Sequence, residues 1–555
     1  MKAVCLILAA AVPLAAAQYY VATNGNDSAA GTLAAPWRTI GKAAGSVQAG
    51  DTVWVRGGDY GNESQTYISS RAGTPAAPIT FAAYPGEKPI VRGFTFNAVS
   101  NYVIIGLTFT NRALRIPPAW QDMPATVVDD PSVVIDPSES WTTRQKKVGK
   151  KYSTYTNIFG QLDYDTSWVD LVSMQRCNNM RLYSNTFWGA TAGIYMRRQC
   201  YNVEVAYNYF YQCLCGMLTY GQSGEGFTVR NARVVSNTFR QMFSTGLSFT
   251  HGACSNLIAY NDSQYSALDH FALHHYASNN VVRNNIGMHG GFYSETMEYP
   301  GSSAFNAHYA GTGNVFDGNF AAYQRDPTLN DGNGFIADMM YNNWGVTFIN
   351  NVAWRNTRGF ALTESPSCRI INNTIAESGW TTNLTFHVGA GIAFARTKDT
   401  NNVVCNNIFY ENNIGLDGYQ LMPKQKKIDN NLYYSSSGKP LMWNGRETNE
   451  ACWYSVAQIQ AATAWEDHGI QGDPLFTGGG FGLSEASPAI NAGTATEAPA
   501  HDYLGVPRGA QPDIGAYEFI PEPVAVWALT VLLMARKLRH DAVVFARPCS
   551  TARRN

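Results

Sequence analysis

Asparagine followed closely by an apolar or aromatic residue recurs at nearly regular spacing along the chain. The members of this series are Asn185, Asn208, Asn237, Asn261, Asn285, Asn319, Asn351, Asn373, Asn407 and Asn431. The steps between them are 23, 29, 24, 24, 34, 32, 22, 34 and 24 residues, so a base period of 22 to 24 residues with loop insertions fits the series. That period predicts a solenoid with three short strands per turn, in which each turn buries its inner face only against its neighbours.

Short apolar segments lie within the repeats. Residues 203–207, 233–235, 280–283 and 368–371 alternate or run apolar with β-branched residues, and Asn, Gly and Ser bound them, as is typical of short buried strands. Helical periodicity is scarce. Asn tolerates left-handed backbone, and its side chain hydrogen-bonds the equivalent residue of the next turn, so we interpret the series as structural rather than ligand-binding.

Composition narrows the function. The chain has 555 residues, of which 45% are hydrophobic and 15% charged, with a formal net charge of -1. These values predict a folded, soluble protein without the basic field that nucleic acid binding requires. Aromatic residues make up 13% of the chain, which suits stacking against sugar rings and equally suits the filling of turns and core.

Both ends resemble targeting segments. Residues 1–17 have the layout of a cleaved secretory signal, with Lys2, an apolar run and three alanines before Gln18. Residues 520–555 resemble a bacterial C-terminal sorting signal, because Pro-Glu-Pro precedes an apolar stretch and a basic group; the apolar stretch is shorter than the ~20 residues that span a bilayer. We expect a secreted or cell-surface protein, with envelope association through the tail, and a monomeric β-helix domain over residues 18–519.

The cysteines follow the same repeat. Cys177, Cys200 and Cys254 each lie two residues before an Asn, which predicts one column on the solenoid. Cys177 and Cys200 would then be rung neighbours about 4.8 Å apart. That distance permits a disulfide, and a stack of reduced, buried thiols explains the spacing as well; we favour the stack.

Four segments carry a resemblance to a known family. Residues 19–27, 31–40, 49–58 and 78–89 resemble the first coils of secreted β-helix polysaccharide lyases, notably pectate lyases of family nine and alginate and chondroitin lyases of family six. Residues 513–518 (Asp-Ile-Gly-Ala-Tyr-Glu) resemble the terminal coil of bacterial β-helix proteins. The resemblance implies an all-β, single-stranded right-handed parallel β-helix of about 22–24 residues per coil with loop insertions, and a carbohydrate-active enzyme.

A lyase that acts by β-elimination needs a cation to neutralise the uronate carboxylate and a base to remove the acidified ring proton. Residues 332–338 are similar to the family-nine segment that bears the catalytic lysine, but Ile336 stands where that lysine is expected. The family's mechanism therefore does not carry over intact.

The repeat suggests other residues for this chemistry. Counting back five residues from strand-opening asparagines gives Arg197, His251 and His275, which predicts that His251 and His275 lie on adjacent rungs. Neighbouring imidazoles lower each other's pKa and favour neutral bases. We expect His251 or His275 as base and Arg197 or Arg198 as the group that neutralises the carboxylate; a structural histidine stack explains the spacing equally well, and metal binding is a third reading.

Further candidates surround this column. His274, Asp269, Arg396, Lys398 and Trp120 are expected to bind substrate, and Asp331 and Asp338, with Asp326 nearby, could hold Ca²⁺ or simply form turns. Glu295 and Glu298 could serve a glycoside hydrolase as an acid pair. Insertions at about 112–175 and 287–332 are predicted to shape a groove, and the first carries a basic, aromatic loop suited to an anionic polysaccharide.

The sequence thus predicts an extracellular polysaccharide lyase acting on a uronate-containing polymer. The alternatives are a glycoside hydrolase on the same fold and a non-catalytic glycan-binding surface protein.

Overall fold

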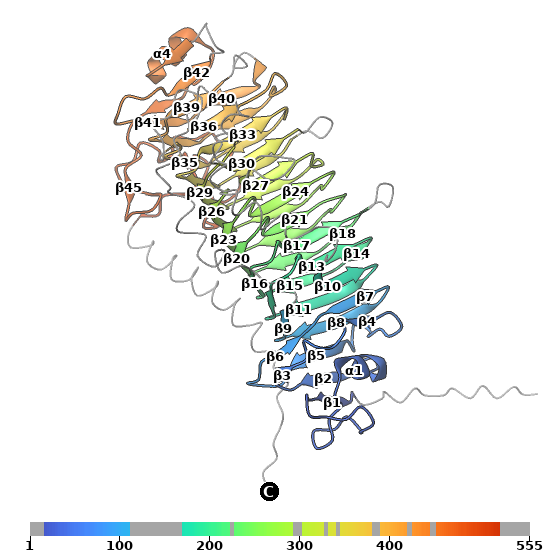
Figure 1. Ribbon diagram of the computed structural model, residues 1–555. Helices are drawn as coiled ribbons and strands as arrows, with labels where there is room; N and C mark the ends of the chain where they lie inside the picture. The colour runs from blue at the N-terminus through green and yellow to red at the C-terminus, as the bar shows by residue number, and fades with distance from the viewer. Residues whose placement is uncertain are drawn as a thin grey trace, which may run out of the picture.

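The computed structural model describes residues 16–110, 169–221, 227–291, 302–326, 331–339, 345–379, 389–418, 424–444 and 451–521. In these ranges the chain winds into a long stack of coils, with the N-terminal coils at one end and the C-terminal coils at the other (Figure 1). This arrangement confirms the predicted right-handed parallel β-helix. None of the described helices is long and apolar enough to cross a membrane.

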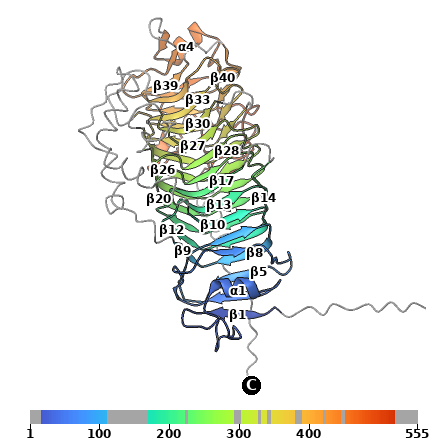
Figure 2. The same cartoon turned by 45° about the vertical axis from the view of Figure 1, so that its right-hand side comes forward.

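Each regular coil contributes one strand to each of three parallel sheets, which run along the solenoid (Figures 1 and 2). Sheet A contains β1 (Gln18–Val21), β2 (Thr52–Val55), β5 (Ile79–Ala83), β8 (Ser100–Ile105), β11 (Asn178–Tyr183), β14 (Cys200–Tyr201), β15 (Glu204–Ala206), β18 (Val229–Arg230), β19 (Arg233–Val235), β22 (Leu257–Ala259), β25 (Val281–Arg283), β28 (Val315–Asp317), β31 (Thr347–Ile349), β34 (Arg369–Ile371), β37 (Val403–Cys405) and β40 (Lys427–Asp429). Sheet B contains β3 (Gly58–Asp59), β6 (Pro89–Val91), β9 (Thr108–Thr110), β12 (Thr186–Trp188), β16 (Tyr209–Tyr211), β20 (Thr238–Met242), β23 (Asp262–Ser266), β26 (Ile286–Gly290), β29 (Phe320–Gln324), β32 (Val352–Trp354), β35 (Thr374–Ala376), β38 (Ile408–Tyr410), β41 (Leu432–Tyr434) and β44 (Ile470–Gln471). Sheet C contains β4 (Thr66–Ile68), β7 (Phe94–Asn97), β10 (Asp170–Gln175), β13 (Ala192–Arg197), β17 (Cys215–Tyr220), β21 (Leu247–Phe249), β24 (Phe271–His274), β27 (Ser303–His308), β30 (Asn333–Asp338), β33 (Arg358–Thr363), β36 (Ala390–Phe394), β39 (Ile414–Asp417), β42 (Met442–Asn444) and β43 (Ala451–Trp453).

The ends of the solenoid are covered by other elements. Helix α1 (Ile40–Ser46) packs at the N-terminal end and α4 (Val456–Ala462) at the C-terminal end (Figure 1). Helix α1 buries Ile40, Ala43 and Ala44. At the C-terminal end, β43 also pairs antiparallel with β42, and α4 buries Val456 and Ile459. The helices and β43 thus cover apolar side chains that would otherwise have no further rung to pack against. The hairpin of β45 (Phe476–Thr477) and β46 (Gly482–Leu483) lies instead beside sheet B, where Phe476 packs against Tyr410 at 5.2 Å.

The core consists of like side chains stacked from rung to rung. Phe271, Phe305, Phe335 and Phe360 occupy one column of sheet C, with ring centroids 5.2, 4.8 and 4.7 Å apart. Because the strands pair in register at about 4.8 Å, a Phe at the same position of each coil forms a continuous buried stack.

The predicted asparagine ladder is confirmed. From Asn185 to Asn431, each ladder side chain donates to the next one at 2.9–3.1 Å, and Asn431 donates to Glu466 at 2.8 Å. The residue before the ladder position, such as Tyr260 with φ 58°, is the one with left-handed backbone. The sequence predicts both left-handed backbone and hydrogen bonding between coils for the same Asn. In the structure these two roles belong to two adjacent residues.

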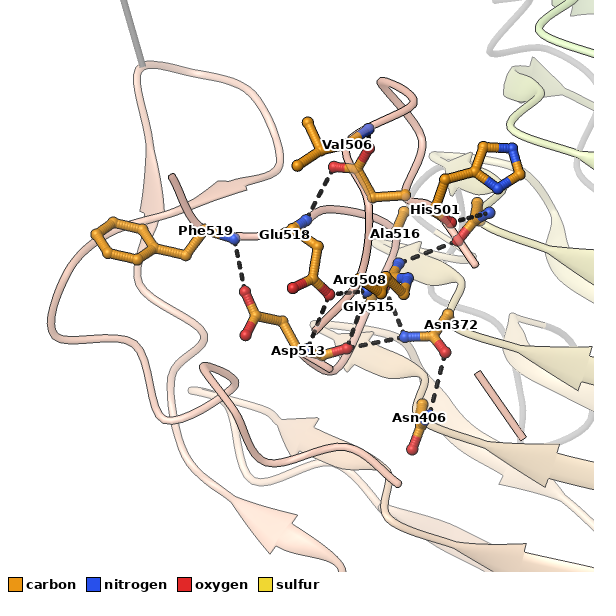
Figure 3. Close-up of polar contacts among 12 residues, drawn as sticks. Asn372, Asn406, His501, Val506, Arg508, Asp513, Gly515, Ala516, Glu518 and Phe519 are labelled. Carbon is orange, nitrogen blue, oxygen red and sulfur yellow. Dashed lines mark hydrogen bonds and ion pairs between the residues drawn. The ribbon is translucent and has the colours of Figure 1, made fainter. Parts of the chain in front are cut away.

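A segment near the C-terminus returns along the side of the solenoid (Figure 3). We call residues 494–518 the C-terminal strap. Its backbone carbonyls accept hydrogen bonds from four asparagines in the turns after sheet A: Asn284, Asn350, Asn372 and Asn406, at 3.3, 2.9, 2.8 and 3.0 Å. Residues 513–518 therefore lie across existing coils and do not add a terminal one.

Three sequence predictions are corrected here. The strands of the solenoid resume with β10 (Asp170–Gln175), within the first predicted insertion, and residues 287–332 are not one insertion because they contain β27, β28 and β29. Cys177 and Cys200 share a column as free, buried thiols, whereas Cys254 pairs with Arg230 one position farther along. The predicted signal and the tail beyond Pro521 lie outside the described residues.

Candidate active site

A histidine cluster lies on the outer face of sheet C. Residues alternate inward and outward along a strand, so the buried Phe271, Phe305 and Phe335 place the residues three positions later on the outside. These are His274, His308 and Asp338, which pair in register across β24, β27 and β30.

The turns that follow these strands supply a second column. His251, His275 and Tyr309 have left-handed backbone, with φ of 54°, 41° and 47°. The His251 and His275 rings stack at 5.2 Å with an interplanar angle of 20°, and Tyr309 stacks on His275 at 5.9 Å. The predicted adjacency of His251 and His275 is therefore present. Tyr220, an exposed residue of the preceding rung, packs on the other side of His251 at 4.5 Å.

Burial sets the charge of these imidazoles. It lowers the pKa of His251, and burial together with the neighbouring His251 and His308 lowers that of His275. His274 is more deeply enclosed, and burial lowers its pKa to about 3. These three rings are neutral near pH 7, because a charged form would lose more hydration than its neighbours replace. Among them, only His275 is exposed.

Thr250 and Asp338 contact histidines of the cluster, and Asp269 lies beside them. The Thr250 hydroxyl lies 2.6 Å from His251 Nδ1 and 3.4 Å from His275 Nδ1. His308 Nδ1 lies 2.8 Å from Asp338 Oδ2. Asp269 accepts hydrogen bonds from the Ser303 amide at 2.8 Å and from Asn306 Nδ2 at 3.2 Å. Burial raises the pKa of Asp269 to about 6, and its Oδ2 lies 3.9 Å from His274 Nε2, beyond hydrogen-bond range.

The predicted arginines lie two rungs away, on β13 and its turn. Arg197 shares a column with Gln175 and Tyr220, not with His251, and forms an ion pair with Asp170 at 3.1 Å. Arg198 occupies the left-handed position equivalent to His251 and His275. The prediction for Arg197 was wrong by one position because Asn202 has left-handed backbone, whereas Asn256 is the next residue of the repeat, after the left-handed Ser255.

Several predicted substrate-binding residues do not join this cluster. Arg396 and Lys398 follow β36, four rungs from β24, which corresponds to about 19 Å at the usual strand spacing. Lys398 forms an ion pair with Glu364 at 3.1 Å. His274 and Asp269 do lie in the cluster. Trp120, Glu295 and Glu298 lie outside the described residues.

The two carboxylates predicted to hold Ca²⁺ have different partners. Asp338 faces His308, whereas Asp331 accepts a hydrogen bond from Asn333 at 3.0 Å and its amide donates to Asp326 at 2.8 Å. Burial and the nearby Asp326 and Asp338 raise the pKa of Asp331 to about 7. Within the ranges that the structure describes, no group of three or more His, Cys, Asp or Glu side chains is arranged to hold a metal ion. Calcium binding stays a prediction, and these residues do not by themselves fit it.

Ile336, the residue at the position expected for the family-nine lysine, lies on the face that carries the histidine cluster. Its side chain is 3% exposed and stands on the outer face of β30, in register with Asn306 and Ala361. An aliphatic side chain cannot transfer a proton, so the chemistry of this face depends on the histidines, tyrosines and carboxylates around it.

Sequence reasoning missed Thr250, Tyr220, Tyr309 and the pairing of His308 with Asp338. The information was available in the aromatic repeat: residues 303–308, 333–338 and 358–363 each have Phe at the third position, and aligning these phenylalanines places His308 beside Asp338. Counting from the asparagines did not find this pair, because the asparagines follow the strands of sheet A whereas His308 and Asp338 lie on strands of sheet C.

Comparisons with known proteins agree with this architecture. Residues 19–119 match the family described as the Pel9A-like, right-handed β-helix region. Pectate lyase PEL9 of Emericella nidulans is 42% identical over 78 residues, which are 14% of this chain and 19% of that protein. The chain thus matches about a fifth of the length of this relative.

Two solved structures extend over more of the chain at low identity. Pectate lyase Pel9A is 15% identical, covers 91% of this chain and 96% of its own, and has a TM-score of 0.42. A mannuronic acid-specific family 6 lyase from human gut microbiota is 11% identical, covers 83% and 92%, and has a TM-score of 0.43. From the matched segment and the three parallel sheets together, we conclude that this chain is a right-handed parallel β-helix protein whose first coils are of the Pel9A-like type.

Proposed function

We propose that this chain is an extracellular polysaccharide lyase that cleaves a uronate-containing polymer by β-elimination on the outer face of sheet C. The observation that carries the proposal is the stacked pair of neutral imidazoles, His251 and His275, at the edge of that face. A neutral, partly solvated imidazole accepts a proton near neutral pH, which is what the first step of the elimination requires. The matched segment of a pectate lyase supports the same class of reaction.

His275 is the proposed base. It is the exposed member of the pair, and its Nδ1 lies near the Thr250 hydroxyl, which leaves Nε2 for the substrate. Arg198 is the proposed group that neutralises the uronate carboxylate. It occupies the same left-handed column three rungs before His275, about 14 Å along the solenoid at the usual strand spacing, so this role requires its long side chain to extend along the column toward the base. Arg197 is less suited because it stands one position earlier, in the column of Gln175 and Tyr220 and not in that of the two histidines.

The test is the formation of unsaturated sugar ends, measured by ultraviolet absorbance. The full chain is incubated with polygalacturonate, alginate and chondroitin sulfate, with added Ca²⁺ and with a chelator. We expect absorbance to rise on one of these polymers and the rate to fall by about 10²–10⁴-fold in His275→Gln, the range by which a general base accelerates a reaction. A requirement for Ca²⁺ would add the ion to the groups that neutralise the carboxylate.

His289 provides a matched control. It also has left-handed backbone, with φ 56°, and it stacks between Tyr265 and Tyr323 at 5.0 and 4.7 Å, but within β26 of sheet B, between β23 and β29. His289→Gln removes a stacked histidine with left-handed backbone from sheet B and leaves sheet C unchanged. If His289→Gln and His275→Gln lose the same activity, or if no polymer yields unsaturated ends, the proposal is wrong.

A glycoside hydrolase is the second candidate because Asp269, with a pKa of about 6, is suited to act as an acid, and Asp338 lies close enough to influence it. This alternative predicts new reducing ends without ultraviolet absorbance, and a loss of activity in Asp269→Asn. A glycan-binding protein would be retained on the polymer and release neither product.

A further inference from the structure

His308 differs from the other histidines of the cluster in having a carboxylate partner. Its Nδ1 lies 2.8 Å from Asp338 Oδ2, and its ring packs edge-on against Tyr309 at 4.3 Å. The two contacts fix the ring from two sides. The Nδ1–H of His308 donates this hydrogen bond to the Asp338 carboxylate. Nε2 is therefore the nitrogen that can exchange a proton with a ligand.

Two kinds of imidazole therefore lie side by side. The ring centroids of His275 and His308 are 6.3 Å apart. His275 contacts a hydroxyl and a second imidazole, and its pKa is lowered. The Asp338 carboxylate instead contacts His308 Nδ1 and orients that ring, in the way that the aspartate of a catalytic triad orients its imidazole. The other titratable groups that face His308 are His274, Tyr309 and Asp269.

We propose that His308 is the general acid of the elimination and that Asp338 is its positioning residue; this inference rests on the lyase function proposed above. His275 Nε2 takes the proton from the ring carbon that carries the carboxylate. The electron pair of that C–H bond forms a double bond to the adjacent carbon, and the bond from that carbon to the glycosidic oxygen breaks. The leaving oxygen takes the proton from His308 Nε2, so one proton enters the site and one leaves it.

The distance between the two rings allows His275 to act as base and His308 as acid on the same substrate. The proton that is removed and the oxygen that departs belong to adjacent carbons, and each needs a donor or acceptor atom at hydrogen-bond distance, roughly 2.6–3.2 Å. Rings 6.3 Å apart allow one substrate bond to lie between them. Ile336 stands where a catalytic lysine was expected and cannot transfer a proton, so the acid role falls to another side chain on this face.

The experiment varies the leaving group. Wild-type protein, His308→Gln, Asp338→Asn and His275→Gln are compared on the polymer and on a uronate that carries an aryloxy group at the carbon from which the glycosidic oxygen departs. An aryloxide departs without a proton, so we expect His308→Gln to lose about 10²–10⁴-fold on the polymer and less than about tenfold on the aryl substrate. His275→Gln should be slow on both, since both reactions need the base.

Asp338→Asn gives a second readout. Asp338 acts through His308, so we expect Asp338→Asn to be slowed on the polymer and much less on the aryl substrate, as His308→Gln is. The double variant His308→Gln with Asp338→Asn should be no slower on the polymer than His308→Gln alone. The thermal midpoint of unfolding is measured for every variant. Rates are compared only among variants whose midpoint equals that of the wild-type protein, so that a folding defect is not read as a catalytic one.

The outcomes separate the two proposals. If the wild-type protein forms no unsaturated ends, the lyase function fails. If it does form them, but His308→Gln is unaffected on the polymer or slowed equally on both substrates, the acid role of His308 fails alone. Equal slowing of Asp338→Asn on both substrates, or a double variant clearly slower on the polymer than His308→Gln alone, would also overturn the inference.

Discussion

Removal of one rung of the asparagine ladder should destabilise the solenoid far more than loss of an exposed turn asparagine. Asn261 lies in the middle of the ladder and is 1% exposed. Its Oδ1 accepts from the Asn237 amide at 2.9 Å and from Asn237 Nδ2 at 3.0 Å, and its Nδ2 donates to Val234 O and to Asn285 Oδ1, both at 2.9 Å. Asn261→Ala therefore removes four buried hydrogen bonds at once.

The magnitude follows from those four contacts. A buried hydrogen bond contributes about 1 kcal/mol net, and a buried group left without its partner costs about 1–3 kcal/mol. The variant leaves the Asn237 amide without its acceptor inside the core, so we expect a loss of roughly 4–6 kcal/mol in the free energy of unfolding. Asn231→Gly is the matched control, because Asn231 is exposed with φ 54°, a conformation that glycine adopts without strain.

The assay is urea unfolding followed by intrinsic fluorescence and far-ultraviolet circular dichroism. Asn261→Asp adds a second comparison, since it keeps the shape and the acceptor but places carboxylate oxygens against Val234 O and Asn285 Oδ1. If the ladder stabilised the fold by packing alone, Asn261→Asp would behave like the wild-type protein. A loss in Asn261→Ala no larger than that in Asn231→Gly would refute the hydrogen-bond argument.

Three further predictions concern the ends and the thiols of the solenoid. Glu466, which terminates the ladder, has a pKa raised by burial to about 7 from 4.5, so the folded state prefers its protonated form. Its contribution to stability should be complete below pH 4.5 and should be lost, by about 3 kcal/mol, as pH rises through 7. In urea titrations at pH 5 and 8, Glu466→Gln should reduce the difference in stability by about that amount, and an unchanged difference would contradict this. Arg508→Met leaves Glu518 without its buried ion-pair partner and should lower the free energy of unfolding by about 3–5 kcal/mol. Hydrogen exchange should become faster first in the C-terminal strap, and uniformly faster exchange along the whole chain would contradict this. Cys177 and Cys200 should both react with an alkylating reagent after unfolding without reductant, and a mass corresponding to a disulfide would show that the stacked thiols are oxidised.

The fold could be predicted because one residue type recurs at the same position of every coil. Each ladder Asn occupies the same position of its coil, so spacing alone recovered ten successive rungs, whatever the loop length between them. The site was harder to predict because the register at one corner does not transfer to another. Asn202 and Asn256 look alike in sequence, but one is the left-handed turn residue and the other the buried residue after it, and this shifted Arg197 by one position.

The pairing of His251 with His275 was predictable because the coils between them have the base length of 24 residues. The contact between His308 and Asp338 spans a coil of 30 residues and depends on the Phe column of sheet C. Arg396 and Lys398 were grouped with the histidines by charge, but the number of intervening rungs, and not residue type, sets the distance. Counting rungs separately for each sheet would have corrected both errors.

The C-terminal strap changes how the solenoid should fold. Most contacts in a stack of coils join residues about one coil apart, so coils could form one after another as the chain emerges and fray one after another from an end. The strap instead joins Tyr503 to Asn284, residues 219 apart in sequence, and reaches its partners only after the intervening coils exist. The strap is therefore expected to dock late in folding. Once it has docked, the last coils can unfold only after the strap releases a contact that lies half the solenoid away. A chain truncated before the strap should still form coils but should unravel from its C-terminal end in small steps.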